Sequence, residues 1–205
     1  MNIPDDSNSL SMKDEVAAFK RERILSAAID LFYERGYDNT TLEVVAESLG
    51  VTKPFIYSHF SSKTELLAEI CGRGIRVSLQ SLRDALLLEA SPTETLRIMS
   101  EAFVVAVLEN QKAIALFTRE EKNLDPEDFR RIADMRREFD KALRAVLEAG
   151  QASGEFRIED AAVTAFSISG LVSWTYVWYR PNGRMSIRKL SLEITRLIMA
   201  MVGSR

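Results

Sequence analysis

Apolar residues recur at helical spacing along most of the chain. In residues 13–35, four of them share one helix face at i, i+4, i+7 and i+8: Ile24, Ala28, Leu31 and Phe32. Eight further segments have helical start and stop signals, and their approximate ranges are 41–49, 53–60, 62–89, 92–110, 111–121, 126–152, 161–179 and 186–202. The pattern predicts an all-α protein of about nine helices, with no strand and a polar tail up to Ser11.

Several helix boundaries carry a specific chemical signal. Gly36 and Gly50 each follow a helical stretch, and glycine readily adopts the left-handed conformation that ends helices. Thr40, with a glutamate three residues later, predicts a capping box at the start of the second helix. Ser91 and Ser186 are the predicted N-caps of the helices that follow them.

Residues 41–60 have the spacing of a helix-turn-helix. Two short helices flank the turn at Gly50, and Ala46 is small enough to let the helices cross closely. Val51 and Ile56 are the expected contacts to the core. The second helix is then free to enter the major groove of DNA, about 12 Å wide, and to present its N-terminal side chains to base edges.

Composition limits the other classes of function. The chain has 205 residues, of which 46% are hydrophobic and 28% charged, as in globular proteins. We find no glycine-rich phosphate loop, no Ser/His/Asp set and no metal-spaced cluster, so we expect neither an enzyme nor a cofactor nor a metal site. No long uninterrupted apolar run is present and the first dozen residues are acidic, which predicts a cytoplasmic protein without a membrane span.

The charge balance alone disfavours nucleic-acid binding. The chain has 27 basic and 30 acidic side chains, a formal net charge of −3, whereas phosphates attract positive surfaces. The charge of the contacting face matters more than the total. Five basic residues lie in or near the helices expected to face DNA: Lys20, Arg21, Arg23, Lys53 and Lys63.

The segment at residues 21–67, RERILSAAIDLFYERGYDNTTLEVVAESLGVTKPFIYSHFSSKTELL, resembles the tetracycline-repressor (TetR) family of transcription regulators. The resemblance rests on an aromatic-rich first helix, Gly-Tyr, Thr-Thr, Ala-x-x-x-Gly-Val and Tyr-x-His-Phe-x-x-Lys-x-x-Leu. It implies a three-helix DNA-binding domain at residues 13–60 and a larger helical domain for ligand binding and dimerisation at residues 61–205. A second stretch, residues 174–186, resembles a subgroup that senses acyl-CoA thioesters.

The resemblance also implies roles for individual residues in a recognition helix at 53–59. Lys53 and Phe55 would face bases and Pro54 a thymine methyl group, while four residues would bind phosphates: Thr41, Tyr57, His59 and Lys63. Phe55 cannot form a hydrogen bond to a base, so it either reads shape or a methyl group or packs against Tyr57. A lone histidine is more often structural, but its place in the motif favours a phosphate contact for His59.

In the C-terminal part, the resemblance implies a dimer built as a four-helix bundle from residues 161–179 and 186–202. Apolar residues of these helices are the expected interface: Ile168, Leu171, Val172, Ile194, Leu197, Ile198 and Met201. An apolar ligand pocket is expected from a second set: Met99, Phe103, Val107, Phe117, Phe139, Phe166, Trp174 and Trp178. The alternative is that these aromatic residues belong to the core or an interface, as aromatic residues at helical spacing usually do.

Two further features have alternative interpretations. The arginine pairs at 130–131 and 136–137 fit a solvated helix face, with a site for an anionic ligand as the alternative. Cys71 is expected to be an inert apolar residue, with redox sensing as the alternative.

The sequence therefore predicts a homodimeric repressor that binds a palindromic double-stranded DNA operator. A small hydrophobic effector, with an acyl-CoA as the candidate, would release it. A DNA-binding or architectural protein of the same fold without an effector is the main alternative, and it would require a packed regulatory core without a cavity. A pure interaction module would show no DNA binding even at low salt.

Overall fold

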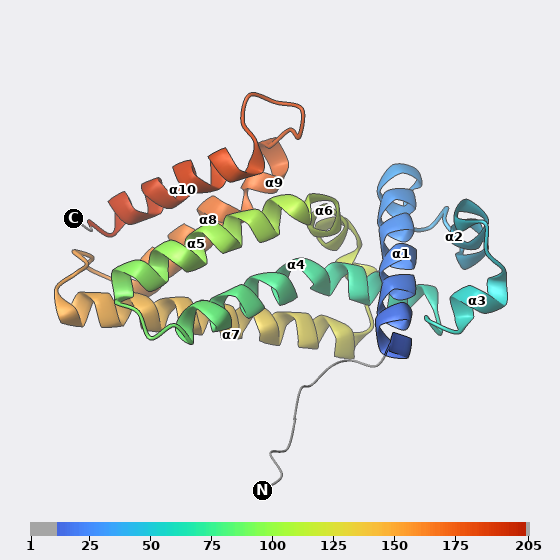
Figure 1. Ribbon diagram of the computed structural model, residues 1–205, viewed down its shortest axis with the longest axis horizontal. Coiled ribbons are helices and arrows are strands. Elements are labelled where there is room, and N and C mark those ends of the chain that lie inside the picture. Colours follow the sequence, from blue (N-terminus) through green and yellow to red (C-terminus); the bar gives the residue numbers. More distant parts are fainter. Residues whose placement is uncertain (1–11, 204–205) are drawn as a thin grey trace, which may run out of the picture. The chain divides into compact units, whose positions relative to one another are not determined.

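The computed structural model describes residues 12–203, and the predicted polar tail lies outside them. These residues form ten α-helices, one short 3-10 helix and no strand (Figure 1). The helices are α1 (Met12–Arg35), α2 (Leu42–Leu49), α3 (Lys53–Tyr57), α4 (Lys63–Leu86), α5 (Pro92–Glu109), α6 (Gln111–Glu120), α7 (Pro126–Ser153), α8 (Ala161–Ser173), α9 (Thr175–Trp178) and α10 (Ile187–Met201), with the 3-10 helix η1 (Glu121–Asn123) between α6 and α7. The all-α prediction is confirmed. The chain divides between Leu66 and Leu67 into an N-terminal and a C-terminal unit.

The N-terminal unit is a small bundle around the inner face of α1. The four residues predicted to share a face of this helix are all buried. Val45 and Ala46 of α2 and Ile56 of α3 complete the core, each no more than 3% exposed. Burial of these side chains fixes the angle at which α2 and α3 cross, and this leaves the opposite side of α3 in solvent.

The caps of α2 differ in part from the prediction. Gly36 and Gly50 have positive φ angles of 86° and 66°, so both glycine ends are confirmed. The N-cap of α2 is Thr41, whose hydroxyl accepts a hydrogen bond from the amide of Val44 at 3.4 Å. Thr40 is instead fully buried and donates to the carbonyl of Gly36 at 2.9 Å. The predicted N-cap is therefore wrong by one residue, because Thr40 closes the preceding turn, and the residue three positions after Thr41 is Val44, which cannot complete a capping box.

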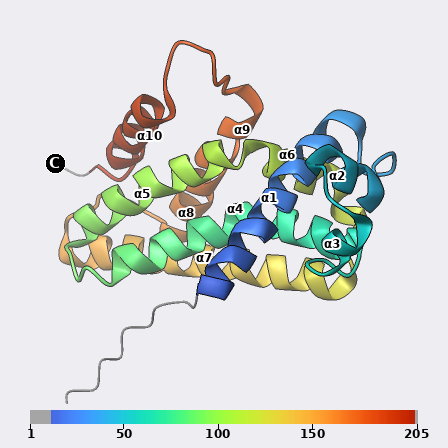
Figure 2. The ribbon, with the colours of Figure 1, turned by 45° about the vertical axis from the view of Figure 1, so that its right-hand side comes forward.

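The C-terminal unit is arranged around α5. This helix packs against α7, α8, α9 and α10, and α10 runs alongside it in both views (Figures 1 and 2). The core contains Leu96 and Val104 of α5, Leu143 of α7 and Ile198 of α10, all essentially inaccessible to solvent. Ser91 and Ser186 accept amide hydrogen bonds from Glu94 and Lys189, so both predicted N-caps are confirmed.

One predicted helix, residues 161–179, is divided in the structure. The chain leaves α8 at Trp174 and continues as the four-residue α9. The stretch Ala161–Trp178 is long and apolar enough to cross a membrane by length and composition alone. Its side chains nevertheless have two environments, because Ala165, Ile168 and Val172 lie in the core of the unit while others face solvent. One buried face and one exposed face are typical of a helix that packs on its own domain.

Gly150 is where the end of α7 meets the segment that follows it. The amide of Phe156 donates to the carbonyl of Gly150 at 2.9 Å, and a Cβ atom on Gly150 would lie 2.0 Å from the Phe156 ring. We expect Gly150→Ala to destabilise the protein by about 1–3 kcal/mol, because overpacking outweighs the roughly 1 kcal/mol gain in helix propensity. Thermal unfolding should show a melting temperature lowered by about 2–12 °C. Adding Phe156→Leu should restore part of the loss; an unchanged melting temperature in the single variant would contradict the steric argument.

Candidate nucleic-acid interface and ligand cavity

Four of the seven predicted DNA contacts are exposed around α3. Lys53 and Pro54 begin this helix, Tyr57 ends it, and Thr41 caps α2. The Lys53 ammonium lies 5.5 Å from the centre of the Tyr57 ring, which brings a cation and a phenol together on one face. The recognition helix is two residues shorter than the predicted 53–59, because Ser58 and His59 lie in a turn.

The Lys53 ammonium forms an ion pair with the carboxylate of Glu43 on α2. The hydrogen bond from Lys53 lowers the pKa of Glu43 to about 2, and the same hydrogen bond raises the pKa of Lys53. A carboxyl group whose pKa is depressed in the folded state stabilises it fully above the ordinary carboxyl pKa, and this contribution is lost only as the pH falls toward 2. The pair is therefore fully ionised at neutral pH. The sequence indicated Glu43 as the glutamate of the capping box and did not predict this ion pair.

The other three predicted contacts are half-buried. Phe55 packs edge-to-face against His59, with ring centres 5.1 Å apart, and not against Tyr57. The ammonium of Lys20 lies 5.7 Å from the centre of the Phe55 ring. The Lys63 ammonium lies 4.0 Å from the centre of the Tyr37 ring. Phe55 thus packs against His59 and Lys20, and part of each of the three predicted side chains remains accessible.

Arg21 ties α1 to the turn that follows α3. Its guanidinium stacks on the Phe60 ring at 4.0 Å, donates to the carbonyl of His59 and lies 3.5 Å from the carboxylate of Glu65. The carboxylate of Glu65 in turn accepts hydrogen bonds from the amide and hydroxyl of Ser61. Arg21 therefore fixes the shape of this turn, whereas the sequence suggested only a charge near DNA.

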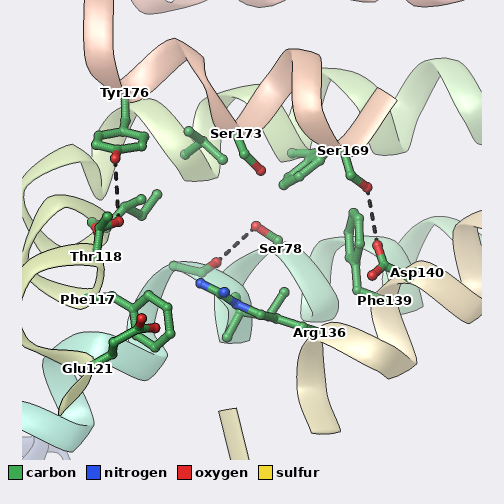
Figure 3. A pocket seen from close by; sticks show the side chains of 15 residues that line it. Ser78, Phe117, Thr118, Glu121, Arg136, Phe139, Asp140, Ser169, Ser173 and Tyr176 are labelled. Atoms are coloured by element: carbon green, nitrogen blue, oxygen red, sulfur yellow. Dashed lines mark hydrogen bonds between the residues drawn. The ribbon is translucent and has the colours of Figure 1, made fainter. Parts of the chain in front are cut away.

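The C-terminal unit contains a cavity of about 430 Å³ (Figure 3). Four predicted pocket residues line it: Phe103, Val107, Phe117 and Phe139. The other four predicted residues lie elsewhere. Met99 is buried in the core, whereas Phe166, Trp174 and Trp178 are 66%, 63% and 48% exposed on the surface. Helical spacing alone did not distinguish the inner and outer faces of α8 and α9, because both are apolar.

Polar side chains also line the cavity, and among them is Arg136, which the sequence indicated as part of the alternative site for an anionic ligand. Ser169 donates to the carboxylate of Asp140 at 3.2 Å, and the hydroxyls of Thr118 and Tyr176 are 3.4 Å apart. Arg136 reaches in from α7 and its guanidinium lies 4.1 Å from the centre of the Phe117 ring (Figure 3). Burial lowers the pKa of Arg136 and raises the pKa of Asp140. The cavity is thus apolar with a polar band, a composition typical of ligand sites.

Cys71 is buried and lies apart from the cavity lining. Burial raises the pKa of its thiol to about 12, with a smaller contribution from the charge of Glu120. Because the thiolate is the reactive form, this environment favours an inert side chain over redox sensing. Among residues 12–203 no group of three or more His, Cys, Asp or Glu side chains is arranged to hold a metal ion.

The predicted dimer residues divide into two sets. Ile168, Val172, Ile194 and Ile198 are in the core of their own unit, where no second copy can reach them. Leu171 is half-buried, and Leu197 and Met201 are exposed. The prediction that the four buried residues form the interface is therefore wrong. The same helices carry other apolar residues that face outward.

The comparisons with known proteins agree with this geometry. A profile of the tetR family of bacterial regulatory proteins matches residues 24–70, and a profile of the tetracyclin repressor-like C-terminal domain matches residues 89–202. The HTH-type transcriptional repressor KstR2 of Rhodococcus jostii strain RHA1 is 27% identical over 182 residues, which cover 88% of this chain and 89% of that protein.

Two solved structures are similar over nearly their whole length. The TetR family transcriptional regulator PfmR from Thermus thermophilus has a TM-score of 0.79 and 32% identity, with 87% of this chain and 97% of that chain covered. AibR in complex with isovaleryl coenzyme A and operator DNA has a TM-score of 0.72 and 26% identity, with 89% and 97% covered. The named relatives are transcription regulators and not enzymes. The chain belongs to the tetR family of bacterial transcription regulators.

Proposed function

We propose that this protein is a homodimeric repressor that binds a palindromic DNA operator and is released by a small hydrophobic effector. The observation that carries the proposal is the exposed face of α3, where Lys53, Pro54 and Tyr57 stand beside the α2 cap Thr41. A lysine and exposed hydroxyls are suited to guanine edges and phosphates. Membership of a family of transcription regulators adds support, and the KstR2 relative is itself named a repressor. A DNA-binding repressor of this kind would act in the cytoplasm.

The proposed dimer interface is the outward face of α8. Val163, Phe166 and Trp174 are each more than 60% exposed and lie on one side of this helix, opposite its core-facing residues. Gly170 lies between them, and a Cβ atom there would meet nothing within 4 Å, so a second helix can approach closely. Leu197 and Met201 of α10 are further exposed apolar residues. Covering such a surface favours association, and a two-fold dimer implies half-sites about one helical turn or a multiple apart.

The proposed effector site is the cavity of the C-terminal unit. A packed core without a cavity was the condition for the alternative, an effector-independent DNA-binding protein, and the cavity therefore favours a ligand-responsive regulator. The neighbour AibR is solved with isovaleryl coenzyme A and operator DNA, which supports an acyl-CoA as the candidate effector. The helix α4 begins at Lys63 and supplies Ile75 and Ser78 to the cavity wall. A ligand that displaces α4 would change operator affinity about 5- to 150-fold, the usual range of allosteric coupling.

The test combines operator selection with effector release. Duplexes are selected from fragmented genomic DNA on the immobilised protein, and fluorescence anisotropy then measures affinity for the recovered site with and without a panel of acyl-CoAs. We expect a palindrome to be recovered and at least one acyl-CoA to weaken binding. Recovery of no preferred sequence would contradict the repressor function, and a site that no thioester affects would contradict the acyl-CoA assignment.

The Glu43–Lys53 pair leads to a further prediction about DNA affinity. Glu43→Gln removes one negative charge from the proposed DNA face and frees the Lys53 ammonium, so affinity for random duplex should rise about two- to fivefold at low salt. Stability should barely change, since both side chains are about half exposed. Anisotropy with a random duplex measures the effect, and Glu47→Gln, an exposed residue on the same helix, is the control. Unchanged or weaker binding by Glu43→Gln would show that the pair does not compete with DNA.

A further inference from the structure

Arg136 differs from the other arginines of α7. Arg131 and Arg137 form ion pairs with Asp128 and Asp134, each three residues earlier on the same helix. Arg130 donates to the carbonyl of Pro126. Among residues 12–203, Arg136 has no hydrogen-bond or ion-pair partner, and its guanidinium instead rests on the Phe117 ring. Within the described residues, the N–H donors of this guanidinium therefore have no protein acceptor.

The position of Arg136 on its helix is equally informative. It lies four residues after Ile132 and three before Phe139, and both of these side chains are buried. Helical spacing thus puts a cation on the inward stripe of α7, where an apolar residue is expected. The Arg136 side chain lines the cavity and is also exposed, so water can reach its guanidinium, and a ligand carboxylate would replace that water.

The carboxylates near Arg136 do not fill this role. Glu121 and Asp140 stabilise the cation by their charges, but neither forms an ion pair with it. Asp140 already accepts a hydrogen bond from Ser169, and burial raises its pKa. Figure 3 shows Arg136 in the cavity below the row of hydroxyls of Ser169, Ser173 and Tyr176. The remaining walls are mainly apolar.

We propose that Arg136 anchors the effector, and that the effector is an apolar acid with a carboxylate at the end that reaches Arg136. The guanidinium would bind the carboxylate with two parallel hydrogen bonds, while the apolar skeleton contacts Phe103, Val107 and Phe139. This inference deepens the proposed function, since it rests on the cavity being the effector site. The carboxylate comes from one of two sources, a free acid or an acyl-CoA whose acyl chain ends in a second carboxylate.

The experiment uses pairs of ligands that differ by one carboxylate. Octanoate is compared with octan-1-ol for the free acid, and octanedioyl-CoA with octanoyl-CoA for the thioester, by isothermal titration calorimetry on the full-length protein. In at least one pair we expect the added carboxylate to tighten binding about tenfold or more. Arg136→Met should abolish that preference and leave the affinity of the uncharged-end partner within about threefold. Arg136→Lys should retain part of the preference, because it keeps the charge but loses the planar fork.

Arg137→Met is the matched control, because Arg137 lies on the same helix, is paired with Asp134 and does not line the cavity. It should behave as the wild type. Absence of a carboxylate preference in both pairs, or a preference that persists in Arg136→Met, would overturn the proposal. Tighter binding of octylamine than of octanoate would also overturn it and would assign the site to a cation. If the ligand-free wild type did not bind an operator, that result would instead contradict the regulator function, whatever its ligand preference.

Discussion

Replacing both Lys53 and Tyr57 by alanine is expected to weaken operator binding at least about 100-fold. Each base-edge or phosphate contact is worth about 1–3 kcal/mol, and a symmetric dimer loses every contact twice. Neither side chain supports the core, since Tyr57 is 45% exposed and Lys53 is exposed beside it. The fold should therefore persist, with a melting temperature close to that of the wild type.

Fluorescence anisotropy with the selected operator measures this effect. Lys122→Ala is a suitable control, because it removes the same charge from an exposed position in the C-terminal unit. The single variants should distinguish the two roles. Lys53→Ala should relax the base preference at its contact, whereas Tyr57→Ala should weaken all sequences nearly equally. If operator affinity were retained in the double variant, α3 would not be the recognition helix.

Phe166→Asp is expected to convert the proposed dimer to a monomer at micromolar concentration and to reduce operator affinity by about 100-fold or more. In the proposed interface each aspartate would be buried without a partner, which costs several kcal/mol, and symmetry places two of them in each dimer. In the monomer the side chain is 66% exposed, so the variant should fold. A monomer presents one recognition helix and loses the contribution of the second half-site.

Sedimentation velocity gives the oligomeric state, and the same anisotropy assay gives the affinity. Phe129→Asp repeats the substitution at an exposed phenylalanine near the start of α7 and should leave a dimer. Phe166→Leu keeps the face apolar and should also leave a dimer. If Phe166→Asp sedimented as a dimer, another surface would have to mediate association.

The sequence predicted the framework of this protein well and its interior chemistry poorly. Helix boundaries at Gly36, Gly50 and Ser91 follow from local backbone chemistry, which a single sequence contains. The division at Trp174 was missed because both halves of that stretch are apolar and the break depends on tertiary packing. The sequence could not show that Ile168 is buried and Phe166 exposed, because a helix that is apolar on all sides gives no signal for which face is inward.

The cavity illustrates the same limit. Phe103 and Phe139 were predicted because apolar spacing indicates residues that face inward, and their rings are 4.6 Å apart in the structure. Arg136 was assigned to a solvated charge run because its neighbours are charged, with a site for an anionic ligand as the alternative. Its signal was present in the chain, namely a cation between Ile132 and Phe139 on the inward register of α7. Only the assembled unit shows that this position opens on a cavity.

The ion pair between Glu43 and Lys53 bears on how a regulator finds one site among a whole chromosome of competitors. The Glu43 carboxylate binds the Lys53 ammonium at the position that a DNA oxygen would take. DNA must therefore displace this carboxylate before Lys53 can bind the DNA. A chance sequence offers only backbone phosphates in exchange, whereas a matching guanine offers two acceptors at fixed positions. This ion pair would shorten the time that the protein spends bound to non-operator sequences, with a modest loss of affinity for the operator. Fidelity in the search would then depend on a residue that never touches the target.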